Sequence, residues 1–200
     1  MRTLDWAYEK ALSGLPGLDS APDLALSYMK QEGSLLDNAN SLIRWQNAKA
    51  GTSGFITGIG GLMTLPVAIP ANLASVLFIQ VRMIAAIAYM GGLDLRDPKV
   101  KTLVYTCLAG NFAKDILQET GIRLGTKFTA LAIERISEKT LLIINQRVGF
   151  RLLTTYGSKG MINLGKVVPL IGGIIGGSID IAATNIIGNM ARDSFLGKEK

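Results

Sequence analysis

The stretch that decides the fold is GFITGIGGLMTLPVAIPANLASVLFIQVR, residues 54–82. It belongs to a run of 32 residues between Lys49 and Arg82 that holds no charged side chain. A bilayer-spanning helix needs about 20 apolar residues, so the run is long enough to matter. Glycines and prolines interrupt it, namely Gly54, Gly58, Gly60, Gly61, Pro66 and Pro70. We therefore compare three interpretations: a transmembrane hairpin, a segment that dips into a membrane, and the core of a soluble bundle.

None of the apolar runs is predicted to be an uninterrupted membrane-spanning helix. The residues before Pro66 are rich in glycine, and the run after Pro70 carries Gln80 and Arg82 near its end. A second apolar run, 167–179, has 13 residues and is stopped by Asp180. We expect a compact helical bundle whose glycine- and proline-rich hairpins are buried or lie partly in the membrane interface.

Helical periodicity and capping residues predict an all-α fold of about seven or eight helices. Ser20, Ser34 and Asp97 are expected N-caps, and the pair Gly91-Gly92 is expected to end the long apolar helix that follows Pro70. The predicted helices cover residues 3–13, 21–33, 35–50, 70–90, 98–120, 122–137, 138–157 and 167–196. The sequence has no segment in which β-branched residues alternate with polar ones, so we expect no sheet. We expect a helical extension over 1–20 and a single domain over 21–196.

The residues predict no catalytic or cofactor chemistry. The chain has no histidine, which removes histidine-dependent triads and zinc motifs, and Cys107 is its single cysteine. The glycine-rich segment lacks the Lys-Ser/Thr pair of a phosphate-binding loop. We therefore expect no enzyme activity, no cofactor and no metal. No zinc pattern or basic strand with interleaved aromatics indicates nucleic-acid binding.

The positive charge is concentrated in the second half of the chain. The net charge is +6, and five bases but no acid lie between Lys139 and Ile179. A basic surface beside apolar segments is typical of proteins that meet anionic lipid, although a plain solvated face gives the same pattern. The candidate headgroup residues are Arg147, Arg151, Lys159 and Lys166.

Two further features concern packing between helices. Glycines four residues apart let helices approach closely, either within a soluble bundle or within a bilayer. In the C-terminal hairpin they follow Pro169, and they are Gly172, Gly173, Gly176 and Gly177. Arg82 and Asp180 each stand in apolar helices, where a lone charge is costly, so we predict that they pair, with Gln80 or Asn185 nearby.

Two long segments of the sequence resemble the EcsC protein family. They are residues 54–110, which include LPVAIP and DLRDP, and residues 141–192, which include GFRLLT and GKVVPLIGG. The resemblance extends over roughly residues 24–195 and implies an all-helical domain. The family is named for a bacterial protein encoded beside two ABC-transporter components. The resemblance therefore implies a membrane context but supplies no reaction and no catalytic residue.

Three non-enzymatic functions remain open from the sequence. The first is a non-enzymatic accessory domain that binds anionic lipid or a membrane-protein partner. The second is a soluble carrier with an apolar pocket near Ile56, Leu62, Val67 and Ile171. The third is a protein whose hairpins insert into the bilayer. The N-terminal segment has no apolar signal-peptide core, so we expect a cytoplasmic protein that is peripheral at the inner face of the plasma membrane.

Overall fold

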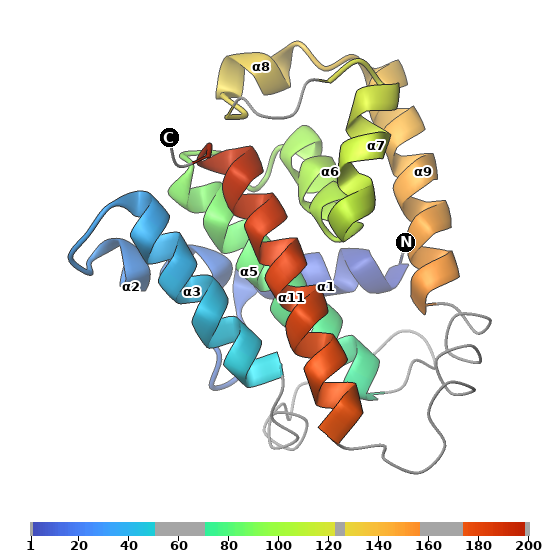
Figure 1. Ribbon diagram of the computed structural model, residues 1–200. Coiled ribbons are helices and arrows are strands. Elements are labelled where there is room, and N and C mark those ends of the chain that lie inside the picture. The colour runs from blue at the N-terminus through green and yellow to red at the C-terminus, as the bar shows by residue number, and fades with distance from the viewer. Residues whose placement is uncertain (1, 51–70, 123–126, 157–173, 199–200) are drawn as a thin grey trace.

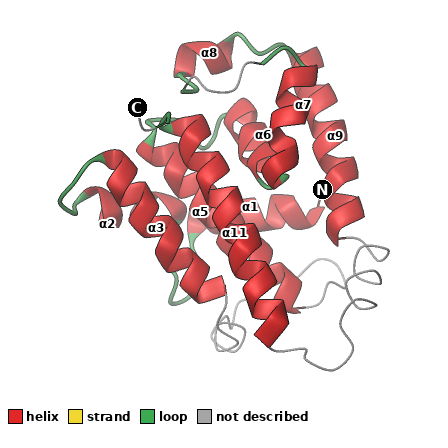
Figure 2. Ribbon diagram, viewed as in Figure 1, coloured by secondary structure: helices red, strands yellow, loops and turns green. Residues whose placement is uncertain are grey.

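The structure, a computed structural model, describes residues 2–50, 71–122, 127–156 and 174–198. In these ranges the chain folds into nine α-helices and one short 3-10 helix, with no named strand (Figure 2). The expected all-α fold is confirmed. The predicted hairpin residues Gly54, Gly58, Gly60, Gly61, Pro66, Pro70, Pro169, Gly172 and Gly173 lie outside the described part, as do Lys159 and Lys166.

The N-terminal helices begin close to the predicted positions, although α2 ends at Met29 and not at residue 33 as predicted. They are α1 (Arg2–Ser13), α2 (Ala21–Met29) and α3 (Leu35–Ala50). The Ser20 hydroxyl accepts a hydrogen bond from the Asp23 amide at 3.2 Å, as an N-cap does. At the start of α3, Ser34 and Asp37 each bind the other's backbone amide with a side-chain oxygen. This reciprocal pair is a capping box with Asp in place of the usual Glu.

The helix α5 (Ala71–Met90) is the centre of the molecule. Its residues from Leu77 to Ala88 are all buried, and it packs against α1, α2, α3, α6 and α11 (Figure 1). A helix that is apolar on nearly every side is stable only when other helices surround it. It ends as predicted: Gly92 has φ +80°, and the Leu93 amide returns to the Ala88 carbonyl at 3.2 Å. The apolar stretch that decides the fold thus supplies, in its described half, the helix around which the others pack.

The prediction of one helix over residues 98–120 is wrong. The chain instead forms α6 (Pro98–Cys107), the 3-10 helix η2 (Gly110–Phe112) and α7 (Ala113–Glu119). Gly110 adopts φ +58°, which an α-helix does not allow, and an added Cβ would lie 3.4 Å from Ile186 of α11. The break therefore lets η2 pack closely against α11.

The remaining helices are α8 (Ala130–Glu134), α9 (Glu138–Tyr156) and α11 (Ile174–Phe195). Only the five residues of α8 are helical in the described part of the segment 122–137, so the helix predicted there is much shorter than expected. The α9 helix packs against α6 and α7 at the edge of the molecule, while α11 packs against α3 and α5 (Figure 1). Gly176 and Gly177 belong to the first turns of α11.

Candidate functional site: an exposed apolar and basic face on α9

The α9 helix buries one side and leaves large apolar side chains on the other. Ile144, Val148 and Leu152 recur at helical spacing and are buried in the shared core. The opposite side carries Leu142, which is 63% exposed, and Phe150, which is 71% exposed. Most exposed apolar residues on soluble proteins stand singly, and grouping on one helix side is the feature that marks interaction surfaces.

We call this side the α9 face and define it by five exposed residues. They are Lys139, Leu142, Ile143, Gln146 and Phe150. Figure 1 shows α9 at the edge of the molecule, with one side turned away from the other helices. Leu131 of the adjacent α8 is also exposed, at 68%. The part of the chain that the structure describes therefore presents apolar side chains from two neighbouring helices, together with a lysine.

The two described headgroup candidates, Arg147 and Arg151, both make contacts within the protein. Arg147 forms an ion pair with Glu119 of α7 at 3.3 Å, and both side chains are more than half exposed. Such a surface pair contributes little stability and exchanges readily with other partners. The Arg151 guanidinium lies 3.3 Å from the centre of the Phe112 ring in a cation–π contact. Both arginines therefore lie on the side of α9 that meets α7 and η2, beside the α9 face.

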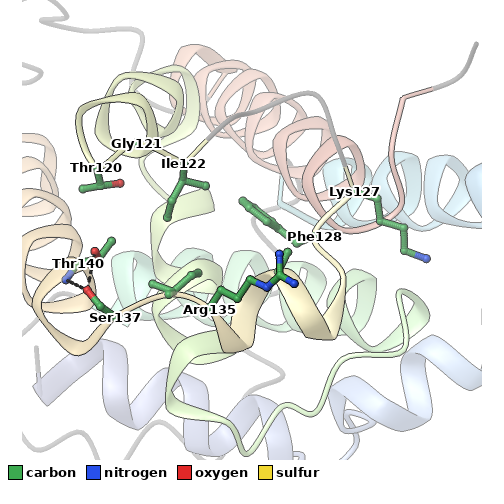
Figure 3. Close-up of a pocket in the computed structure, with 10 residues that line it drawn as sticks. Thr120, Gly121, Ile122, Lys127, Phe128, Arg135, Ser137 and Thr140 are labelled. Carbon is green, nitrogen blue, oxygen red and sulfur yellow. Dashed lines mark hydrogen bonds between the residues drawn. The ribbon is translucent and has the colours of Figure 1, made fainter.

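A pocket of about 360 Å³ lies near the start of α9, between the end of α7 and α8. Its lining residues are Thr120, Gly121, Ile122, Lys127, Phe128, Ala132, Arg135, Ile136, Ser137 and Thr140. Figure 3 shows the Arg135 guanidinium near the Phe128 ring, while the Lys127 side chain points away from the other labelled residues. The sequence analysis did not single out Lys127 or Arg135, because they lie outside the acid-free stretch that drew attention to the bases.

The wall of this pocket is fixed to the core. The Phe128 amide donates a hydrogen bond to the Ser194 carbonyl at 2.8 Å, and its ring packs against Phe195 with the centroids 6.2 Å apart. On the opposite side, Ser137 caps α9 by accepting from the Thr140 amide at 3.2 Å. These three contacts hold the lining residues in place without a ligand.

The predicted partner of Arg82, the Asp180 side chain, lies outside the described residues, so the pair stays a prediction. Arg82 is only 1% exposed. Its Nη1 donates to the Asp19 carbonyl at 3.1 Å, and its guanidinium lies 5.4 Å from the centre of the Phe78 ring. Burial lowers the pKa of Arg82, and the nearby Asp19 carboxylate acts in the opposite direction. Its Nε and Nη2 atoms have no hydrogen-bond partner among the described residues.

The polar residues expected beside Arg82 make other contacts. Gln80 donates to the Thr184 hydroxyl at 3.2 Å, and Asn185 accepts a hydrogen bond from Asn47 at 3.0 Å. These bonds join α5 and α3 to α11. They hold the helices in register, which is an architectural role.

The described ranges hold neither a metal cluster nor an activated cysteine. Those ranges contain no group of three or more His, Cys, Asp or Glu residues placed to hold a metal ion. Burial raises the pKa of the Cys107 thiol to about 12, so it is protonated at neutral pH and a poor nucleophile. Of the helices in the described part, none combines the length and hydropathy needed to cross a bilayer. The residues proposed for an apolar carrier pocket, Ile56, Leu62, Val67 and Ile171, lie outside it.

The described part of the chain is therefore an all-α protein with a central apolar helix and an exposed apolar face on α9 that carries one lysine. A comparison with protein families matches the EcsC protein family over residues 33–196. The chain belongs to this family. Neither a search of curated proteins nor a search of solved structures found a match. The matched span begins after α2, yet buried residues of α1 and α2, among them Tyr8 and Leu24, belong to the same core as α5.

Proposed function

We propose that this protein binds an anionic lipid surface through the α9 face, as a non-enzymatic peripheral protein on the cytoplasmic side of a membrane. The observation that carries the proposal is the placement of Leu142 and Phe150, both mostly exposed, on one side of α9 beside Lys139. Large apolar groups next to cations are what an interfacial helix presents to a bilayer. The helix would lie on the surface and would not cross it.

The expected binding energy is that of a reversible peripheral contact. Removing a Leu or Phe side chain fully from water stabilises by about 1.5–3 kcal/mol. A Lys or Arg near an anionic membrane adds about 1 kcal/mol. Lys139 supplies one positive charge on the face, and the neighbouring exposed Glu138 offsets it, just as Glu134 and Arg135 offset each other at the end of α8. Apolar insertion should therefore provide most of the affinity, and lipid charge should modulate it.

The test is flotation of the detergent-free protein with vesicles of phosphatidylglycerol or of phosphatidylcholine, at low and high salt. We expect flotation with the anionic vesicles and weaker flotation at high salt, because salt screens the cationic contribution. The double variant Leu142→Ser/Phe150→Ser should stay at the bottom. The matched control is Leu26→Ser/Met29→Ser on α2, which replaces two other exposed apolar residues and should float like the wild type.

Two results would overturn the proposal. One is a wild-type protein that stays at the bottom with every vesicle. The other is a Leu142→Ser/Phe150→Ser variant that floats as well as the wild type. Because both substitutions lie on an exposed side, the helical circular dichroism and melting temperature should not change, which separates loss of binding from loss of folding.

A further inference from the structure

The pocket beside α9 has a chemistry that the α9 face alone does not explain. Two of its ten lining residues are basic, Lys127 and Arg135, and none is acidic. Its apolar part includes Phe128 and Ile136, which are both buried. Because the Lys127 side chain points away from the other lining residues, Arg135 is the cation of the pocket (Figure 3). A hollow with a guanidinium on one side and apolar walls on the other fits a ligand that has an anionic group joined to an apolar part.

Two hydroxyl groups add to the polar side. The Ser137 and Thr140 hydroxyls lie 2.9 Å apart and share one hydrogen bond. Ser137 Oγ also accepts a hydrogen bond from the Thr140 amide. The two hydroxyl groups carry two hydrogens between them, and one of these is used in the bond that joins the two hydroxyls. One hydroxyl hydrogen remains to be donated to a ligand. The Thr120 hydroxyl, in contrast, already donates to the Leu117 carbonyl at 2.8 Å.

The geometry connects the pocket to the α9 face. Thr140 lines the pocket, and Ile143 of the face lies three residues further along α9, on the same side of the helix. Leu131 and Arg135 are four residues apart at α8, so the most exposed apolar residue of α8 stands beside the pocket arginine. The pocket therefore lies beside the face, and a lipid whose phosphate contacts Arg135 can hold its apolar part against Phe128 and Ile136.

We propose that this pocket binds the phosphate group of an anionic phospholipid, with Arg135 as the principal contact and the Ser137–Thr140 pair as a second donor. The planar guanidinium presents a fork of donors that matches phosphate oxygens. The pocket volume of about 360 Å³ has room for a phosphate and the glycerol attached to it. This inference rests on the proposed lipid surface, and it adds a defined headgroup site to it.

The experiment is calorimetric titration with a short-chain phosphatidylglycerol, kept below its micelle concentration so that no surface is present. Inorganic phosphate and glycerol phosphate are titrated in parallel. We expect saturable binding of the short-chain lipid and much weaker binding of the two water-soluble phosphates, because they lack an apolar part. Arg135→Gln should weaken binding of the lipid by about tenfold or more, since the variant loses a charged hydrogen-bond donor to the phosphate.

Two variants make the result specific to the pocket. Arg44→Gln removes an exposed arginine from α3, on another helix, and should bind like the wild type. Leu142→Ser/Phe150→Ser should abolish vesicle flotation but leave binding of the short-chain lipid within about twofold. That outcome separates the pocket from the face, because neither Leu142 nor Phe150 lines the pocket.

The failures of the two proposals can be told apart. Flotation of the wild type without saturable binding of the short-chain lipid, or equal binding by Arg135→Gln and the wild type, would overturn the headgroup site and leave the lipid surface standing. Binding of inorganic phosphate as tight as that of the lipid would assign the pocket to a free phosphate. Saturable, Arg135-dependent binding of the lipid without flotation would support the pocket and overturn the proposed surface.

Discussion

The Tyr105 hydroxyl donates a hydrogen bond to the Asp5 carboxylate, 3.1 Å away, and so ties α6 to α1. The same Asp5 oxygen lies 2.7 Å from the Lys101 ammonium. Nearby, the Tyr8 hydroxyl donates to the Leu95 carbonyl at 2.7 Å, and the Tyr8 and Tyr105 rings pack edge to face. The N-terminal helix, which precedes the span matched by the family, is therefore held by polar bonds as well as by its apolar side.

Asp5→Ala should destabilise the whole protein and not only α1. The variant removes a hydrogen bond to a charged acceptor and a partly exposed ion pair, together about 1–2 kcal/mol after allowance for solvent screening. Urea unfolding followed by circular dichroism measures the change. Glu32→Ala, which removes an exposed carboxylate between α2 and α3, should change stability by less than about 0.5 kcal/mol. Equal effects of the two variants would contradict the role of Asp5.

The two tyrosines predict a loss of stability at high pH. Burial raises the pKa of both Tyr8 and Tyr105, and nearby carboxylates raise it further. An unfolded tyrosine releases its proton near pH 10, while the folded protein holds it, so the unfolding free energy falls as the pH rises above about 10. Below that pH the contribution is complete and constant.

Tyr105→Phe should therefore differ from the wild type in its pH profile. At neutral pH the variant should be less stable by about 1 kcal/mol, because it lacks the hydrogen bond to Asp5. Above about pH 10 the difference should shrink, since the variant no longer has this group to titrate. Urea midpoints measured across the alkaline range test this, and parallel profiles for the two proteins would rule it out.

The pairing of Arg82 with Asp180 predicts a strong energetic coupling. Removing one partner of a buried pair leaves an uncompensated charge, so Asp180→Ala should cost about 3–5 kcal/mol. A double-mutant cycle with Arg82→Met and Asp180→Asn isolates the interaction, and we expect a coupling above about 1 kcal/mol. Asp115→Ala, at an exposed position of α7, is the control. A coupling near zero would leave the Asp19 carbonyl and Phe78 as the contacts that hold Arg82.

At Gly188 the α11 helix lies so close to α3 that there is no room for a side chain. A Cβ added there would lie 2.8 Å and 2.9 Å from two carbons of the Ile43 side chain. Gly188→Ala should therefore destabilise by about 1–3 kcal/mol through overpacking. The cost in an Ile43→Ala background should be clearly smaller, because the opposing carbons are gone. Strict additivity of the two substitutions in thermal or urea unfolding would show that this contact does not limit the packing.

Cys107 should be unreactive while the protein is folded. Its thiol is buried, and its pKa of about 12 leaves almost no thiolate at pH 8. A thiol reagent should label the native protein only at the rate at which it unfolds, and should label it completely in denaturant. Rapid labelling of the native protein at pH 8 would contradict the burial of this residue.

Local chemistry made several helix ends predictable from the sequence. Ser20, Ser34 and Asp97 cap helices within a few residues of their own position, and Gly92 ends α5 by a left-handed turn. Each of these needs only the neighbouring backbone, so no knowledge of distant segments is required. The break at Gly110 could not be predicted in this way. Gly110 lies close to Ile186 of α11, a residue far away in the sequence, and this contact depends on the tertiary structure.

The sequence by itself determined that this protein is helical and that it has no histidine chemistry. It also determined that the apolar helix after Pro70 must be buried by other helices, because nearly all of its side chains are apolar. The tertiary structure decided which residues stay outside. Apolar residues occur around the whole of α9, from Leu141 to Phe150, so periodicity could not tell its buried side from its exposed side. Contacts with α6 and α7 bury Ile144 and Val148 and leave Leu142 and Phe150 in water. The same holds for the pocket, whose lining comes from separate segments: side-chain burial depends on long-range packing, which local sequence does not encode.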